Sequence, residues 1–388
     1  MKKSLLISLT IPLFIAGCDT KDEVRVPACD SNANGTLREM ICDFISETRA
    51  GADMEDLEII GVEVKVYNSL GEEIDTIFET RSETMDQTFT LSTVRFSKSG
   101  VNGFCILSDD KRLDEIYYLS EYGEPSDTSY IVPLKEYIET VPLIAANDLE
   151  KTSTTDVSEA IYIGPLVEYK WGQGYPFNIV APLCSGVSCS SPEFNGHMPV
   201  GCAPLALATF IATTKHNGRY PGVDLFNLPL TNDAFVPSQQ DNIFKFMSEM
   251  TSACDVEFGC RDTGKNGSGI KENGFFRMSQ YLVGLQYQTD YQSRSQLDES
   301  KLFAQLKLGA PHIMGGFDKR GENGHAWLID GLRKNAKSFM YHCVWGWNGA
   351  GDGWIKGDYY TSSVGGISFS EGQSHIYITR MPLGNIRP

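Results

Sequence analysis

A cysteine and a histidine lie 123 residues apart in two short motifs whose residue types suit nucleophilic catalysis. The first motif is PVGCAPLALA, residues 199–208, and contains Cys202. The second is GHAWLIDG, residues 324–331, and contains His325. A thiolate is a strong nucleophile, and an imidazole can accept its proton and later return it to a leaving group. The two motifs therefore predict a catalytic pair, with Cys202 as nucleophile and His325 as general base.

The residues around each motif predict the elements that position the pair. Good helix formers and apolar residues follow Cys202, and Pro204 is acceptable in a first helical turn. Cys202 is thus expected at a helix N-terminus, where unpaired N–H groups and the helix dipole favour a thiolate. The residues around His325 alternate between apolar and small or polar, which predicts a strand.

Neither residue is diagnostic alone, because a lone cysteine is more often a buried apolar residue or half of a disulfide. Two further segments support the assignment of a catalytic pair. In WGQGYPFN, residues 171–178, Gln173 lies in a glycine-flanked turn and could donate its side-chain N–H to an oxyanion. The segment YHCVWGWNG, residues 341–349, reads as a glycine-rich hairpin, and we expect Trp347 and the later Trp354 to be core residues.

The four motifs, in this order, resemble the streptopain family of papain-like cysteine peptidases over roughly residues 160–388. The resemblance implies an α+β fold with two subdomains, an N-terminal helix that carries the cysteine and a C-terminal twisted antiparallel sheet that carries the histidine. It also implies an endopeptidase made as an inactive precursor, with protein or peptide substrates and no cofactor. The implied roles are nucleophile for Cys202, general base for His325, oxyanion donor for Gln173 and aromatic wall over the histidine for Trp345.

One position departs from the family pattern. Members of this family carry an asparagine directly before the tryptophan, and this chain has Val344. An asparagine there would accept a hydrogen bond from the imidazole Nδ1–H and hold the ring in its productive tautomer. Three alternatives follow: another acceptor or a water replaces the asparagine, packing of Trp345 holds His325, or the enzyme is impaired. Asn348 is the nearest polar candidate in sequence.

These alternatives leave two other functions open. A catalytically impaired pseudopeptidase could act as a surface binding protein. A Cys/His acyl- or peptidyl-transferase would use the same two residues, in a cleft that excludes water.

The N-terminus predicts export. Two lysines, an apolar run and the junction Ile15–Cys18 (IAGC) are typical of a secretory leader, and the run is too short to form a stable spanning helix. A cysteine after Ala-Gly resembles the bacterial lipoprotein signal, in which the thiol is lipidated. We therefore expect residues 1–17 to be removed and Cys18 to anchor the protein in the bacterial cell envelope, facing the periplasm or the cell surface. The mature domain could later be released.

Composition divides the remainder into two domains. Residues 19–155 carry 29 acidic against 12 basic residues, whereas residues 156–388 carry 21 against 19. The formal net charge of −17 argues against nucleic-acid binding. Strand-like runs at 57–67, 88–96 and 103–108 predict a small α+β domain, which the resemblance identifies as an inhibitory pro-domain spanning residues 18–155. The polar stretch 145–156 is expected to be a linker before a peptidase domain at 156–388.

The ten cysteines suit an exported chain. Close pairs predict disulfides, although the sequence cannot fix their connectivity: Cys184/Cys189, Cys254/Cys260 and Cys29/Cys42. Cys105 and Cys343 lie in apolar runs and are expected to be buried. Because the chain lacks Cys-x-x-Cys and His-Glu-x-x-His motifs, we expect no metal site.

Overall fold

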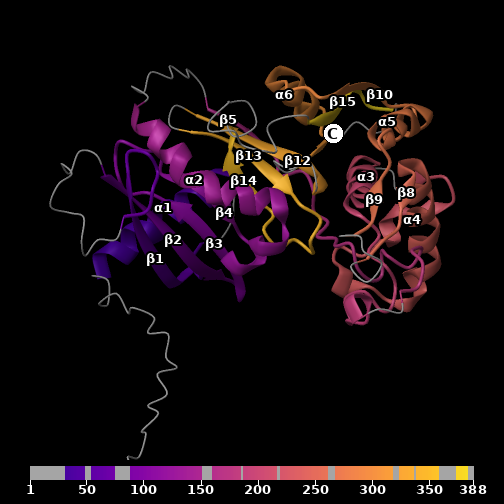
Figure 1. The fold of residues 1–388 in the computed structure, drawn as a ribbon, viewed down its shortest axis with the longest axis horizontal. Helices are drawn as coiled ribbons and strands as arrows, with labels where there is room; N and C mark the ends of the chain where they lie inside the picture. The colour runs from indigo at the N-terminus through magenta and orange to yellow at the C-terminus, as the bar shows by residue number, and fades with distance from the viewer. Residues whose placement is uncertain are drawn as a thin grey trace, which may run out of the picture.

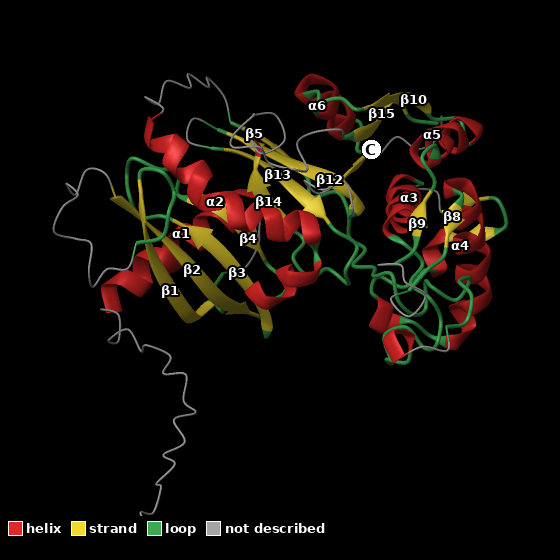
Figure 2. Cartoon of the chain, viewed as in Figure 1, coloured by secondary structure: helices red, strands yellow, loops and turns green. Residues whose placement is uncertain are grey.

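The computed structural model describes most of the chain beyond the predicted leader (Figures 1 and 2). The described residues are 31–48, 54–74, 88–150, 160–184, 187–215, 219–260, 267–317, 323–335, 338–357 and 373–382. The leader, Cys18, Cys29 and the domain boundary predicted at residue 155 lie outside them. Among the described helices, none has the combination of length and apolarity that crossing a membrane would require.

The N-terminal region is an antiparallel sheet whose two faces are covered by different helices. Successive residues of a strand point to opposite faces, so Phe104 and Ile106 join the apolar cluster under α2, whereas Cys105 and Leu107 join the one under α1. The strand-like runs predicted from sequence are confirmed as β1, β2 and β3. The elements are α1 (Ser31–Thr48), β1 (Glu58–Asn68), β2 (Thr88–Lys98), β3 (Val101–Leu107), β4 (Ile116–Ser120), η2 (Pro125–Tyr130) and α2 (Val132–Glu150).

A helical subdomain surrounds the helix that begins at Cys202. Every residue of α3 after Cys202 is buried, because apolar and small side chains occupy all sides of this helix. In α4, the buried Ile243, Phe246, Met247 and Met250 recur every three or four residues and pack on one face. The elements are η3 (Val187–Cys189), α3 (Cys202–Thr214), β6 (Arg219–Tyr220), β7 (Val223–Asp224), η4 (Leu225–Asn227), η5 (Asn232–Ala234), η6 (Pro237–Gln239), α4 (Gln240–Cys254), β8 (Val256–Glu257), β9 (Gly269–Ile270) and α5 (Gly274–Gly284).

A second antiparallel sheet carries His325 on its long strand β12. One face of this sheet packs against α3, where Ala326, Leu328 and Val344 join the apolar cluster of the helical subdomain. This arrangement confirms the predicted α+β architecture, with the cysteine on a helix and the histidine on an antiparallel sheet. The elements are β5 (Ile161–Ile163), β10 (Gln288–Ser293), α6 (Glu299–Lys307), β11 (His312–Phe317), β12 (Gly324–Lys334), β13 (Phe339–Val344), β14 (Gly353–Lys356) and β15 (Ser374–Arg380).

The two sheets are continuous. Strand β4 pairs antiparallel with β14, so that Leu119 lies opposite Trp354 and Tyr118 opposite Ile355. In the described residues the strand order is β1-β2-β3-β4-β14-β13-β12-β11-β15-β10, with β5 added beside β12. Figure 1 shows the N-terminal strands joined in this way to the sheet that carries β12, with α3, α4 and α5 on the far side. The N-terminal region therefore covers what would otherwise be an open sheet edge.

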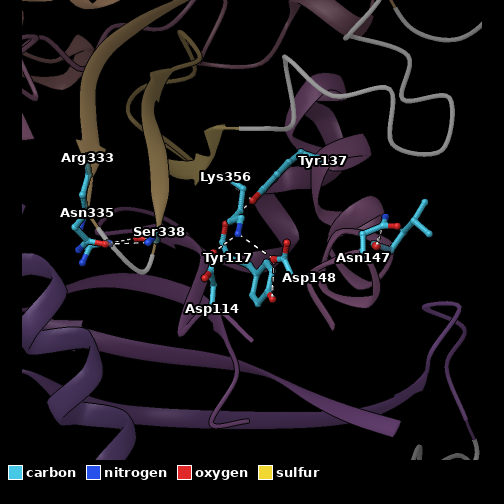
Figure 3. Close-up of polar contacts among 10 residues, drawn as sticks. Asp114, Tyr117, Tyr137, Asn147, Asp148, Arg333, Asn335, Ser338 and Lys356 are labelled. Carbon is cyan, nitrogen blue, oxygen red and sulfur yellow. Dashed lines mark hydrogen bonds and ion pairs between the residues drawn. The ribbon is translucent and has the colours of Figure 1, made fainter. Parts of the chain in front are cut away.

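A buried cation lies at the junction between the two regions (Figure 3). The Nζ atom of Lys356 contacts the carboxylates of Asp114 and Asp148, at 3.0 Å in the second case, and the lysine side chain is only 6% exposed. The main-chain N–H of Lys356 donates to the hydroxyl of Tyr137 at 2.9 Å. All three partners come from the N-terminal region, so Lys356 ties β14 to that region.

The linker prediction is partly wrong. Residues 145–150 form the last turns of α2, and Ala145 and Ala146 are 0% and 3% exposed. Their apolar contacts in the cluster under α2 outweigh the polar character of the surrounding stretch. A linker can begin only after Glu150, within residues that the structure does not describe.

Loss of the Lys356 ammonium should destabilise the full chain strongly. Lys356→Gln leaves two carboxylates facing one another without their cation, and breaking a buried ion pair costs about 3–5 kcal/mol. The matched control is Lys135→Gln, because Lys135 pairs at 3.8 Å with the exposed Glu139 and should cost less than about 1 kcal/mol. Urea unfolding of the two variants measures the difference. Similar small losses in both would contradict a structural role for the buried pair.

Candidate active site

Cys202 is the first residue of α3, as the sequence predicts. The preceding Gly201 has φ = 97°, a conformation that favours glycine, and a Cβ atom there would lie 3.2 Å from the carbonyl oxygen of Ser268. This strained turn brings the chain sharply into the helix and leaves the Cys202 thiol at its tip, half-buried.

The thiol meets the strand that carries His325. The Sγ atom of Cys202 accepts a hydrogen bond of 3.3 Å from the main-chain N–H of Ala326, the residue after the histidine. Helix α3 packs against β12, so the two motifs that are 123 residues apart in sequence become neighbours. Within the described residues, no hydrogen bond joins the thiol to the imidazole itself.

The imidazole of His325 is held by a main-chain carbonyl. Its Nε2 atom lies 2.9 Å from the carbonyl oxygen of Trp345. A carbonyl can only accept, so Nε2 carries the proton and Nδ1 keeps its lone pair. The expectation of a proton on Nδ1 is therefore wrong, because the acceptor binds the other ring nitrogen, and in this tautomer Nδ1 can act as a base.

Two indoles flank the imidazole ring. The ring of Trp327 is nearly parallel to that of His325, with an interplanar angle of 12° and a centroid distance of 6.1 Å. The ring of Trp345 lies 6.5 Å away at 33°. The predicted role of Trp345 as an aromatic neighbour is therefore consistent with its position. The sequence reasoning missed Trp327, which stands two residues after His325 and so on the same face of β12.

Burial sets the charge states of the pair. It raises the pKa of the Cys202 thiol, and hydrogen bonds from the main chain of Ala326 and Ala203 only partly offset this. It lowers the pKa of His325 to about 4, although the bond to the Trp345 carbonyl opposes the shift. The main-chain N–H groups at the helix N-terminus lower the pKa of the thiol, as expected, but burial outweighs them in the full chain. At neutral pH the pair is a thiol beside a neutral imidazole.

Trp345 is fixed in turn by a carboxyl group. Its main-chain N–H donates to Oδ1 of Asp352 at 2.7 Å. Burial raises the pKa of Asp352 to about 7. The main-chain carbonyl of Asp352 accepts from the hydroxyl of Ser120 at 2.7 Å, and that of Gly351 accepts from the hydroxyl of Tyr118 at 2.7 Å. Three consecutive contacts therefore link the N-terminal region to His325. The hydroxyl groups of β4 bind the turn at 351–352, Asp352 in this turn binds the N–H of Trp345, and the Trp345 carbonyl binds the imidazole.

Val344 cannot orient the histidine, and neither does Asn348. The Val344 side chain is 7% exposed and packs in the apolar cluster around α3. The Asn348 side chain lies against Gly172, and its buried Oδ1 has no hydrogen-bond partner among the described residues. Of the alternatives that the sequence leaves open, replacement by another acceptor fits best, and that acceptor is the carbonyl of Trp345.

Gln173 lies in a turn packed against the segment that leads to Cys202. Its side chain is 8% exposed, and its main-chain carbonyl accepts from the N–H of Val200 at 3.0 Å. The flanking glycines are required, because a Cβ atom at Gly174 would lie 2.4 Å from the Glu193 carbonyl oxygen. The turn that contains Gln173 is thus hydrogen-bonded to the chain two residues before Cys202.

The aspartate of the histidine motif binds the segment at residues 166–167, upstream of Gln173. Oδ2 of the fully buried Asp330 accepts from the main-chain N–H groups of Leu166 and Val167 at 3.0 and 2.9 Å. Its Oδ1 lies 2.6 Å from Nδ1 of His342. The sequence gave no signal for this role, because the partners are main-chain groups more than 160 residues away.

Of the predicted disulfide pairs, the structure brings Cys184 and Cys189 together, in one group with Cys260, whereas Cys29 lies outside the described residues. Sγ of Cys184 lies 2.8 Å from Sγ of Cys260. With Cys189 these two sulfurs form a group within 4.8 Å, whose residue types could also hold a metal ion. Cys254 lies instead in the core of the helical subdomain. Cys105 and Cys343 are fully buried, as expected.

A surface hollow of about 690 Å³ lies elsewhere, between α4 and α5. Its lining includes Glu249, Arg277 and Tyr281 but neither Cys202 nor His325. It takes no part in the site described above.

Comparison with known proteins agrees with the fold. The family model of the peptidase C10 family matches residues 213–355. Streptopain of Streptococcus pyogenes is 26% identical over 314 residues, covering 70% of this chain and 75% of that protein. A fragment of Prevotella intermedia prointerpain A has a similar fold, with a TM-score of 0.53 and 20% identity over 75% of this chain and 96% of that one. The chain is thus similar to the peptidase C10 family, the family of streptopain, and is a cysteine endopeptidase.

Proposed function

We propose that this chain is the precursor of an exported cysteine endopeptidase in which Cys202 is the nucleophile and His325 the general base. The observation that carries the assignment is the pair of contacts at the site. The thiol is bound to the residue after His325, and the Trp345 carbonyl selects the imidazole tautomer that leaves Nδ1 as a base.

The proposed mechanism follows from these positions. His325 Nδ1 takes the thiol proton, and the Cys202 thiolate attacks the carbonyl carbon of a peptide bond. The N–H groups of the Gln173 side chain and of the Cys202 main chain stabilise the oxyanion. His325 then protonates the leaving amine, and afterwards activates the water that releases the acyl group.

In the full chain the pair is not ready to react. A thiol with a raised pKa and an imidazole with a pKa of about 4 favour the neutral forms over a thiolate–imidazolium pair. We assign this restraint to residues 18–155 as an inhibitory pro-domain. The hydroxyl groups of β4 bind the carbonyls of Gly351 and Asp352. The Asp352 carboxyl group in turn binds the N–H of Trp345, and the Trp345 carbonyl binds His325.

Several contacts besides β4 support strong binding of the pro-domain. Arg333 of β12 binds Glu47 of α1, with Nη2 to Oε2 at 2.5 Å, and its guanidinium lies 4.5 Å from the ring centroid of Phe44. Lys170, only three residues before Gln173, lies over the ring of Tyr122 at 3.9 Å. Because these contacts join the pro-domain both to β12 and to the segment before Gln173, removal of the pro-domain should free the turn that positions Trp345.

Cleavage after α2 should activate the thiol. Between pH 6 and 7, alkylation of Cys202 by iodoacetamide should be at least roughly tenfold faster after cleavage within residues 151–159 than in the full chain, because the thiolate then forms. Peptide mass mapping measures the adduct, and the buried Cys105 and Cys343 serve as internal controls. Hydrolysis of an unfolded protein substrate should increase in parallel. Equal alkylation rates before and after cleavage would exclude inhibition by the pro-domain.

The same samples test self-processing. Cys202→Ala expressed alone should remain full length, whereas wild type matures. Maturation of Cys202→Ala to the same fragment, with no protease added, would show that Cys202 does not make the cut. If the cleaved wild type fails to hydrolyse any unfolded substrate, the catalytic assignment fails.

Restoring the family asparagine should not accelerate the enzyme. In Val344→Asn the Trp345 carbonyl still occupies Nε2 of His325, so turnover should not rise. An amide placed in the apolar cluster around α3 should lower stability by about 1–3 kcal/mol. Turnover and Tm measured together separate the effects, with Val344→Thr as a control of nearly equal volume. Faster turnover by Val344→Asn would mean that His325 lacks an acceptor in the wild type.

The leader supports export and anchoring to the bacterial cell envelope through Cys18. Cys18→Ser should therefore move the protein from the membrane fraction to a soluble one, because the lipid-carrying thiol is lost. Cys29→Ser is the control and should leave the distribution unchanged. Immunoblots of fractionated cells give the result, and equal solubility of wild type and Cys18→Ser would leave plain secretion as the better explanation.

A further inference from the structure

Three cysteine side chains meet in the helical subdomain. The Sγ atoms of Cys184, Cys189 and Cys260 all lie within 4.8 Å of one another. Cys189 and Cys260 are buried, whereas Cys184 is half-buried between residues of high exposure, with Leu183 75% and Val187 86% exposed. The cluster is therefore a preformed group with one sulfur near solvent.

The spacing of the sulfurs favours a disulfide over a metal site. Two thiolates on one tetrahedral zinc ion lie about 3.8 Å apart, given a Zn–S distance of about 2.3 Å. The sulfurs of Cys184 and Cys260 are at 2.8 Å, nearer than such a site allows. Among the described residues, the group also offers only three ligands, where a structural zinc site takes four.

The two cysteines belong to different segments that both touch the approach to Cys202. The loop around Cys184 and Cys189 is closed through Gly196, whose main chain bonds to both cysteines at 2.8 and 3.0 Å. The segment before Cys260 binds Ser268 through the N–H of Gly259 at 3.1 Å, and the Ser268 hydroxyl donates to the Pro199 carbonyl at 2.5 Å. A bond between the two segments would enclose the chain just before the nucleophile.

We propose that Cys184 and Cys260 form a disulfide that joins these two segments, with Cys189 as a third thiol able to exchange with it. The oxidant is a small-molecule or protein disulfide. One thiolate attacks it and releases one thiol, and the second thiolate then attacks the mixed disulfide and releases the other. Two cysteine thiols and one disulfide thus become one protein disulfide and two thiols. In the exchange step, the Cys189 thiolate attacks Cys184 and Cys260 leaves as a thiolate.

The experiment is a non-reducing peptide map of the full chain carrying Cys202→Ala, after equilibration with oxidised glutathione and alkylation in denaturant. The expected product links the peptides of Cys184 and Cys260, with Cys189, Cys254 and Cys343 alkylated. Cys260→Ser should abolish the link, and Cys254→Ser, the control outside the cluster, should retain it. In Cys184→Ser, a link between Cys189 and Cys260 is expected instead. Reduction should lower Tm by roughly 5 °C or more, with no such change in Cys260→Ser.

Three outcomes would overturn the proposal. The first is a predominant link between the sequence neighbours, Cys184 with Cys189 or Cys254 with Cys260. The second is a full set of alkylated thiols despite the oxidant. The third is one zinc ion per chain that survives dialysis, depends on all three cysteines and prevents oxidation, which native mass spectrometry would reveal. Because the map is read from a chain with unaltered cluster residues, misfolding of a cluster variant does not affect it.

Discussion

The pairing of β4 with β14 is the interaction on which the precursor's architecture depends. It makes one continuous sheet from two, and it brings Tyr118 and Ser120 against the carbonyls of Gly351 and Asp352. Hydrogen bonds along a sheet edge are sensitive to position, so a shift of β4 by one residue would reverse the faces of its side chains. The buried Lys356 and its two carboxylates add a charged contact beside this pairing.

The geometry of the site depends on the Trp345 carbonyl. A main-chain acceptor can orient an imidazole as well as an asparagine side chain does, provided that the carbonyl itself is fixed. Here the N–H group of the same residue is bound by Asp352, which sits in the turn held by β4. The family's asparagine can therefore be lost at position 344 without loss of the productive tautomer, and its replacement by valine improves the apolar packing around α3.

Sequence patterns predicted the main elements because those depend on local periodicity. The helix after Cys202, the strand at His325 and the three N-terminal strands all follow from the spacing of apolar residues. Sequence patterns could not predict contacts between segments that lie far apart in the chain. Cys184 and Cys260 are 76 residues apart, so their proximity could not be predicted from sequence spacing, which favours near neighbours. The net effect of burial on the Cys202 pKa likewise depends on tertiary packing, which outweighs the helix dipole.

Nitrogen-15 NMR of the histidine rings measures the central claim directly, namely that the full chain holds His325 as a neutral imidazole protonated on Nε2. Ser120→Ala removes the hydroxyl group that binds the Asp352 carbonyl. Cys202→Ala prevents processing during the titration. The account predicts an Nε2–H tautomer for His325 from pH 8 down to a pKa of about 4. An Nδ1–H tautomer, or titration near the ordinary histidine pKa of about 6.5, would contradict it.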